Sequence, residues 1–285
     1  MTEPQTASDY DDRTTAAVKK VLLEIGQILG SYKGKFAVIG GAVPWLLLDN
    51  QEMRHVGTFD VDLSLDAEGL GDGEYASLVE SLMGAGYEQR EPRKRFQLVR
   101  SVPADEEGAP PIDVIVDFLM PRDAEIVKNS PPLVQDFAVQ RADGADLALR
   151  FYRMVAIDGP MPNGGQNRVE IAVASIPALM AMKGFAITNR LKQKDAYDIY
   201  YCIRNFDGGA AGLAEACRPL LEVKDGLEGY KGIAAKFETP DSFGPTCVRN
   251  FVLESRILGD RTADQWQQDA FGQVDVWLRA LGLRG

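Results

Sequence analysis

The chain has 285 residues, of which 45% are apolar and 26% charged, and its formal net charge of −11 argues against a general nucleic-acid coat protein. It contains no apolar run of about 18 residues and no signal-peptide pattern, so we expect a cytoplasmic protein without membrane spans. Three cysteines without a CxxC pair argue against a disulfide framework, and the single histidine, His55, interpreted as a loop residue, argues against a histidine-rich metal cage.

The first part of the chain predicts alternating helices and strands. After a polar tail over residues 1–12, which we expect to be disordered, helices are predicted at 14–31, 42–48 and 74–83. Strands are predicted at 36–39, 58–65, 94–101, 112–120, 147–154 and 169–173. The segment 121–146 is rich in Pro and Asp and predicts loops or short helix. We therefore expect an α/β domain over residues 13–173.

From Ser175 the pattern changes to helices. Ser175 can cap a first helix that has Pro177 in its first turn. Further helices are predicted at 192–205, 209–222, 246–257 and 262–282. The chain thus predicts a helical C-terminal domain over residues 174–285.

Two aspartates on one predicted strand are the most informative feature. Asp60 and Asp62 alternate with apolar residues, so both side chains point to the face opposite the core. Aspartate is disfavoured in strands, and two neighbouring carboxylates repel each other unless a cation lies between them. Because Mg²⁺ prefers carboxylate oxygens and retains phosphate and water ligands, the pair predicts a metal site for a phosphate-bearing substrate.

A second predicted strand repeats this pattern. Asp113 and Asp117 share its polar face, while the other face is apolar. If the two strands are neighbours, Asp113 could complete a three-carboxylate cluster that holds two cations. One cation would activate an attacking hydroxyl, and the other would neutralise a triphosphate. Asp117 is the alternative third acid.

Gly40 and Gly41 separate the predicted strand 36–39 from the predicted helix 42–48. Glycines let the backbone approach a phosphate closely, and a helix N-terminus offers free N–H donors. A tight strand–helix turn explains the glycine pair equally well. Its place on the unit that precedes the aspartate pair favours the phosphate-binding interpretation.

Two stretches are positive although the chain is acidic. Residues 88–100 and 181–205 each carry five positive and two negative charges. Such islands suit a local phosphate-bearing ligand better than a long groove, and two solvated charged surfaces are the alternative.

The second positive stretch holds a compact charged motif. Lys183 and Arg190 share a helix face if their helix extends that far, and Lys194, Asp195 and Asp198 follow in the next helix. Lys183 could reach a triphosphate as a point charge, and Arg190 and Lys194 could contact phosphate or hold the acids. Ordinary helix stabilisation is the alternative, because acids near a helix N-terminus and i, i+4 ion pairs are common.

The order of these motifs resembles a known superfamily. The motifs are Gly40-Gly41, Thr58-x-Asp60-x-Asp62-Leu63 and Ile112-Asp113-Val114. This order resembles the DNA polymerase beta nucleotidyltransferase superfamily. The later motif, Lys183…Arg190…Lys194-Asp195-x-x-Asp198, resembles its AbiEii branch, the toxins of bacterial type IV toxin–antitoxin pairs. The resemblance covers roughly residues 35–205.

The resemblance implies an α+β fold in which helices flank a small mixed β-sheet, followed here by the helical domain. It implies Mg²⁺ or Mn²⁺ held by Asp60 and Asp62, with a nucleoside triphosphate as substrate. The third acid varies in this branch, and Asp113 is our candidate for the third metal ligand. It implies that Asp195 or Asp198 helps to activate the acceptor. The candidate nucleotide-binding residues are Gly40, Gly41, Thr58, Lys183, Arg190 and Lys194.

The resemblance also bears on the acceptor and the partner. Some members of the branch modify tRNA 3′ ends, so the first expectation is transfer of a nucleoside monophosphate to RNA, with an antitoxin protein as partner. The acidic body instead favours a small cationic acceptor such as an aminoglycoside, and a non-catalytic nucleotide-binding module is a third alternative. Ala42 departs from the common pattern, in which Ser or Thr follows the glycines, so a hydroxyl contact to phosphate would be missing.

Overall fold

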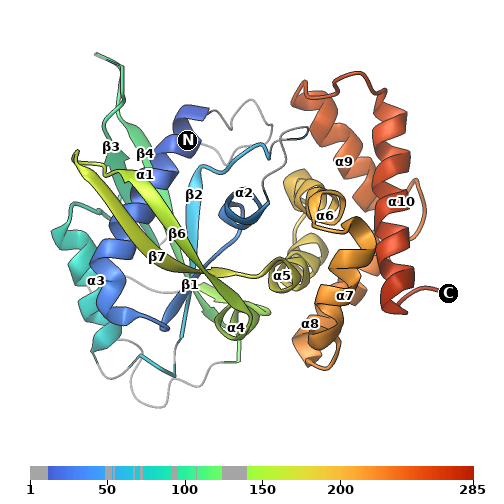
Figure 1. Cartoon of the computed structure of the whole chain (residues 1–285), viewed down its shortest axis with the longest axis horizontal. Helices are drawn as coiled ribbons and strands as arrows, with labels where there is room; N and C mark the ends of the chain where they lie inside the picture. Colours follow the sequence, from blue (N-terminus) through green and yellow to red (C-terminus); the bar gives the residue numbers. More distant parts are fainter. Residues whose placement is uncertain are drawn as a thin grey trace. The chain divides into compact units, whose positions relative to one another are not determined.

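The computed structural model describes residues 12–48, 53, 55–66, 68–70, 73–90, 96–106, 108–123 and 140–285. Residues 1–11 of the tail predicted to be disordered, and 124–139 of the predicted loop segment, lie outside the described residues. The chain forms two compact units (Figure 1). The first comprises Asp12–Val43 and Gly57–Ser175, and the second includes Pro44–Val56 and Ile176–Gly285.

In its described part, the first unit is built on a seven-stranded mixed sheet with the order β3-β4-β2-β1-β7-β6, in which β5 also pairs with β4. The strands are β1 (Phe36–Ile39), β2 (Asp60–Leu65), β3 (Gln97–Val102), β4 (Ile112–Pro121), β5 (Gln140–Ala142), β6 (Tyr152–Pro160) and β7 (Gln166–Ala174). β2 lies between β1, to which it is antiparallel, and β4, to which it is parallel. The two strands that carry the aspartate patterns are therefore direct neighbours.

The helical segments that begin in this unit are α1 (Asp12–Ile28), η2 (Leu29–Tyr32), α2 (Ala42–Leu47), α3 (Glu74–Gly84) and α4 (Ala145–Arg150). α1 contacts β3, β4, β6 and β7, and it buries Val18, Val21, Leu22 and Ile25 at helical spacing. On β2, Ser64 lies on the same face as Asp62, and its hydroxyl donates to the carbonyl of Ala145 at 2.9 Å. α4 thus covers the far end of the polar face, while Asp60 and Asp62 remain half-buried at its near end.

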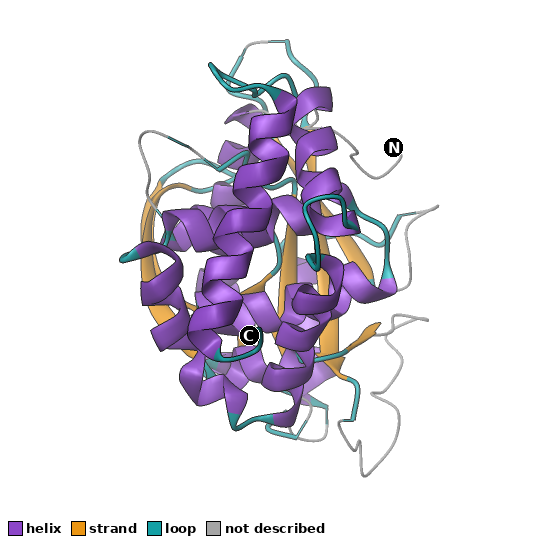
Figure 2. Cartoon of the chain, turned by 90° about the vertical axis from the view of Figure 1, so that its right-hand side faces the viewer, coloured by secondary structure: helices purple, strands orange, loops and turns teal. Residues whose placement is uncertain are grey.

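The second unit is helical in its described part, and Figure 2 shows its helices around the C-terminus. They are α5 (Ile176–Asn189), α6 (Gln193–Asn205), α7 (Gly209–Leu221), α8 (Lys224–Lys236), α9 (Phe243–Glu254) and α10 (Ala263–Leu281). α10 begins with a capping box, in which Thr262 accepts from the backbone N–H of Gln265 and the Gln265 side chain accepts from that of Thr262. It ends at Gly282 with φ 75°.

The predicted fold class is confirmed, since a mixed sheet with flanking helices precedes a helical C-terminal region. The strand predicted at 147–154 is wrong over its first half. Ala145–Arg150 forms α4, in which Ala145, Leu147 and Ala148 are buried, and the strand begins at Tyr152. The short run of apolar residues fits both the helix period of about 3.6 residues and the strand period of about two, so the pattern alone did not distinguish helix from strand.

Two further features differ from the prediction. The segment Pro44–Val56, expected in the first domain, belongs to the second unit. α8 is not predicted by the sequence pattern, because its three glycines disfavour a helix. These glycines permit close packing instead, since a Cβ on Gly229 would clash with the carbonyl of Ala181 in α5.

Candidate functional site

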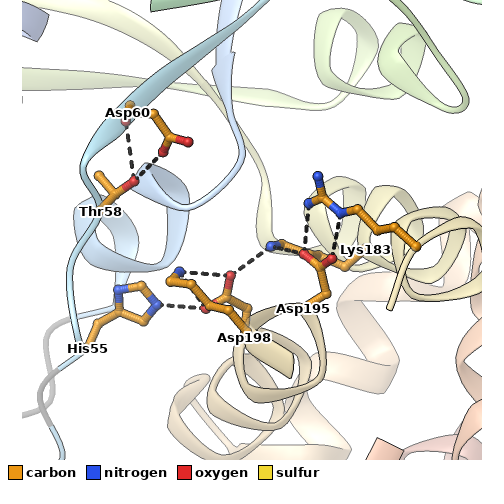
Figure 3. A network of polar contacts seen from close by, with 8 residues as sticks. His55, Thr58, Asp60, Lys183, Asp195 and Asp198 are labelled. Carbon is orange, nitrogen blue, oxygen red and sulfur yellow. Dashed lines mark hydrogen bonds and ion pairs between the residues drawn. The ribbon is translucent and has the colours of Figure 1, made fainter. Parts of the chain in front are cut away.

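The first cluster of candidate residues lies at the start of β2. Asp60 and Asp62 are on one face of the strand, as predicted, because the buried Val61 and Leu63 occupy the other. The hydroxyl of Thr58 donates to Oδ1 of Asp60 at 2.8 Å, which holds one carboxylate in place (Figure 3). Thr58 therefore supports an acid in this structure, and its predicted contact to the nucleotide stays a prediction.

Gly40 lies against the second carboxylate. It follows Ile39, the register partner of Asp62, and adopts a left-handed backbone with φ 71°. A Cβ on Gly40 would clash with Oδ2 of Asp62, so only glycine fits beside this carboxylate. The side chain of Ala42 is 1% exposed, so the position that lacks the usual hydroxyl packs in the interior.

The register of the sheet distinguishes the two candidates for a third acid. β2 and β4 are parallel, and Asp62 pairs with Asp117. Asp113 lies four residues earlier on β4, where it accepts from Nη1 of Arg90 at 3.2 Å and from the hydroxyl of Ser101. The structure thus brings Asp117 beside Asp62 and does not bring Asp113 there.

Two carboxylates side by side fit Mg²⁺ chemically. In the described part of the chain, no three His, Cys, Asp or Glu side chains converge closely enough to hold a metal ion by themselves. Mg²⁺ is usually bound by only one or two carboxylates, together with substrate phosphates and water. Asp60 and Asp62 supply that number of hard oxygen donors, so the residues present match the predicted cation.

The second cluster is a buried charge network in the helical unit. Nζ of Lys183 in α5 lies 2.7 Å from Oδ1 of Asp195 and 2.7 Å from Oδ2 of Asp198, both in α6 (Figure 3). The side chains of both acids are 1% exposed or less, and that of Lys183 is 9% exposed. Asp195 and Asp198 thus share one face of α6, as their i, i+3 spacing predicted, whereas the contact of Lys183 with both acids was not predicted from the sequence.

Three further side chains complete the network. Arg190 donates through Nε and Nη2 to the two oxygens of Asp195, at 2.7 and 3.0 Å. Lys194 donates to both oxygens of Asp198, at 3.0 and 3.1 Å. Nε2 of His55 lies 3.0 Å from Oδ1 of Asp198. Arg190 follows the last residue of α5, so it meets Asp195 across the loop between the two helices.

Electrostatics keep the two acids ionised. Burial raises the pKa of Asp195, but the charge of Lys183 and the hydrogen bond from Arg190 outweigh it and lower the pKa to about 2. Burial acts in the same way on Asp198, and Lys183 and Lys194 hold its pKa well below the ordinary value. Carboxylates with such low pKa values are weak general bases near neutral pH. The network is therefore suited to holding cations in place.

His55 is the member that the sequence did not reveal. Its interpretation as an ordinary loop residue is incomplete, because its side chain is 1% exposed and bonded to Asp198. It is 143 residues from this partner, and no local spacing pattern connects the two. Its status as the single histidine of the chain is the only signal that could have drawn attention to it.

Comparison with known proteins identifies the family. The family model described as "Nucleotidyl transferase AbiEii toxin, Type IV TA system" matches residues 58–275, a span that contains β2, β4 and the members of the charge network other than His55. The chain belongs to the AbiEii family. It is accordingly a nucleotidyltransferase.

A search of solved structures found proteins similar to this AbiEii nucleotidyltransferase. The chain resembles the crystal structure of JHP933 from Helicobacter pylori, with a TM-score of 0.50, 10% identity, and coverage of 96% of this chain and 95% of that one. It also resembles an antigenic nucleotidyltransferase-like protein from Paracoccidioides brasiliensis, with a TM-score of 0.40, 15% identity, and coverage of 77% and 94%. No curated protein matches the chain.

Several described cations of the two positive stretches form internal ion pairs in this AbiEii protein. In the first stretch, Arg90 contacts Asp113, and Arg100 contacts Glu24 at 2.7 Å. In the second, Arg204 contacts Asp269 at 2.5 Å. These three described cations therefore stabilise the fold locally. None of the described helices is long and apolar enough to cross a membrane.

Proposed function

We propose that this AbiEii nucleotidyltransferase transfers a nucleoside monophosphate from a nucleoside triphosphate to an RNA acceptor, with a tRNA 3′ end as the first candidate. The observation that carries the proposal is the arrangement on the central strands. Asp60 and Asp62 share one face of β2, and Asp117 pairs with Asp62 from β4. The like charges of Asp60 and Asp62 on one strand face repel each other, so the arrangement favours a bound divalent cation.

Asp60 and Asp62 would hold Mg²⁺ or Mn²⁺. Asp117, which pairs with Asp62 in the sheet register and accepts from Gln97 at 2.8 Å, is a nearer candidate for a third acid than Asp113. When bound there, the cation supplies positive charge for the triphosphate and polarises the acceptor hydroxyl. Thr58 orients Asp60 through its hydroxyl, and Gly40 leaves room for Asp62. The backbone at Gly40 and Gly41 stays a candidate contact for the phosphates.

Lys183 is the candidate phosphate ligand of the helical unit. An ammonium group has three N–H donors, and Nζ of Lys183 donates to Asp195 at 2.7 Å and forms an ion pair with Asp198 at 2.7 Å. In this proposal a further N–H of Lys183 binds a substrate oxygen. Arg190, whose side chain is 56% exposed, is held by Asp195 in a position to offer a second cation. In this proposal Asp195 and Asp198 orient cations and do not abstract the proton of the acceptor.

The acceptor and the partner rest on the family. A type IV toxin of this kind would act on RNA in the cytoplasm and would be neutralised by an antitoxin protein. The net charge of −11 favours the alternative acceptor class, a small cationic molecule such as an aminoglycoside. A transfer assay distinguishes the two acceptor classes, because a labelled nucleotide would be found either on RNA or on the small molecule.

The test is a transfer assay with each α-labelled nucleoside triphosphate in turn, Mg²⁺, and either total tRNA or a set of aminoglycosides. The double substitution Asp60→Asn/Asp62→Asn preserves the shape of both side chains and removes their charge. Label that enters RNA with the wild type and not with the double variant supports the proposal. Label that enters an aminoglycoside supports the alternative, and nucleotide binding without any transfer contradicts both.

A further inference from the structure

His55 is buried in the helical unit and is hydrogen-bonded to Asp198 of the charge network. Its side chain is 1% exposed, and that of Asp198 is fully buried. Nε2 of the imidazole lies 3.0 Å from Oδ1 of Asp198. A polar ring placed so deeply must be hydrogen-bonded to offset its loss of water.

The direction of this hydrogen bond follows from the charge of both partners. An ionised carboxylate can only accept, so Nε2 must carry the proton. Burial lowers the pKa of His55 to about 4, although the hydrogen bond to Asp198 opposes this effect. The ring is therefore neutral near pH 7, in the tautomer that is protonated on Nε2.

A neutral donor suits the charge balance of the network. Three cations, Lys183, Arg190 and Lys194, already face two anions, Asp195 and Asp198. A further cation would add a second excess positive charge in the interior, which is costly without an anionic partner. Imidazole supplies a hydrogen bond to the carboxylate without that charge.

The hydrogen bonds around Asp198 show what His55 stabilises. Oδ2 lies 2.7 Å from Nζ of Lys183 and accepts from Lys194 at 3.1 Å, and Oδ1 accepts from Lys194 and from His55, each at 3.0 Å. His55 thus holds the oxygen opposite the one that anchors Lys183. The imidazole is itself fixed by an edge-on contact with the ring of Tyr201, at 4.8 Å between centroids and 70° between planes.

We propose that His55 is a positioning residue for nucleotidyl transfer, which fixes the Asp198 carboxylate and thereby the Nζ of Lys183 that receives the triphosphate. This inference rests on the proposed function, because it assigns Lys183 to the triphosphate. His55 is not a catalytic residue in this proposal, because it acts through Asp198.

Three substitutions of His55 test the proposal. His55→Gln retains an N–H donor near the position of Nε2, His55→Asn places its donor near that of Nδ1, and His55→Leu removes the donor. We expect His55→Leu and His55→Asn to raise the KM for the nucleotide roughly tenfold or more, because a hydrogen bond to a charged group is lost. His55→Gln should restore most of this loss.

A stability control separates positioning from a general loss of structure. Trp277→Phe shrinks a fully buried ring of α10 that packs edge-on against Tyr230 at 5.3 Å, in the same unit. It should lower the melting temperature while the KM for the nucleotide stays at the wild-type value. If Trp277→Phe raises this KM as His55→Leu does, or if His55→Gln fails to rescue, the positioning role is wrong.

The single histidine also permits a direct test without turnover. Nitrogen-15 spectra of the imidazole should show the neutral tautomer protonated on Nε2 throughout pH 5.5–8 (about the range in which an exposed histidine titrates). A ring that titrates near 6.5, or a proton on Nδ1, would overturn the inference. Wild-type protein that transfers no nucleotide contradicts the proposed function, whereas active wild type with an equally active His55→Leu variant contradicts this inference alone.

Discussion

The carboxylate of Asp62 lies directly against Gly40, in the space that a side chain at position 40 would fill. Two independent requirements therefore meet at this glycine. Its φ of 71° disfavours any other residue, and its missing Cβ makes room for Oδ2 of a candidate metal ligand. The glycine motif thus serves the acid pair, in addition to any contact that its backbone makes to a phosphate.

Gly40→Ala should abolish most of the activity for this reason. Gly34 provides a matched control, because it has φ 83° but no heavy atom within 4 Å of an added Cβ. Both substitutions should cost roughly 1–2 kcal/mol of stability through the left-handed backbone. Only Gly40→Ala should also lower kcat, by about 100-fold, because it displaces Asp62. Equal activities of the two variants at matched stability would contradict the role of this contact.

Asp117→Asn and Asp113→Asn should differ strongly in their effects. Asp117 pairs with Asp62, so its loss should lower kcat by about 10²–10⁴-fold, as for a group that takes part in proton transfer or metal binding. Asp113 is partly exposed and paired with Arg90, so its loss should cost less than about 1 kcal/mol and leave turnover near the wild-type value. Steady-state kcat values of the two variants, measured with saturating Mg²⁺, test this prediction. A larger loss of kcat in Asp113→Asn than in Asp117→Asn would restore Asp113 as the third acid.

The stability of the helical unit should depend on pH through His55. Burial lowers its pKa from 6.5 to about 4, so the unfolded chain takes up the proton first. The contribution of neutral His55 is therefore complete above pH 6.5 and is lost as the pH falls towards 4. Compared with His55→Gln, the wild type should lose about 2 kcal/mol more between pH 7 and pH 4.5, measured by urea unfolding. A constant difference between the two proteins would show that the ring is not buried in its neutral form.

The parts of the site that were predicted correctly depend on local patterns. The alternation around Asp60 and Asp62 identifies a strand and its polar face, because side chains in a strand alternate with a period of two. The spacing of Lys194 and Asp198 likewise predicts their contact within one helix turn. Neither feature requires knowledge of the rest of the fold.

The parts that were missed depend on contacts distant in the sequence. Asp113 and Asp117 occupy the same face of β4, and only the register with β2 places Asp117 beside Asp62. The bond from His55 to Asp198 joins a loop to a helix 143 residues away. Pairing of this kind is set by the folded chain as a whole, so neither composition nor periodicity contains it.

The close packing of α5 on α8 yields a prediction that is independent of catalysis. A Cβ on Gly229 would clash with the backbone carbonyl of Ala181, whereas a Cβ on Gly272 in α10 would meet no heavy atom within 4 Å. Gly229→Ala should therefore destabilise the protein by about 1–3 kcal/mol or more, since two backbones must move apart. Gly272→Ala should stabilise it by about 0.5–1 kcal/mol, because alanine loses less conformational freedom in a helix. Urea unfolding of both variants measures the difference, and a neutral Gly229→Ala would show that the two helices are not in direct backbone contact.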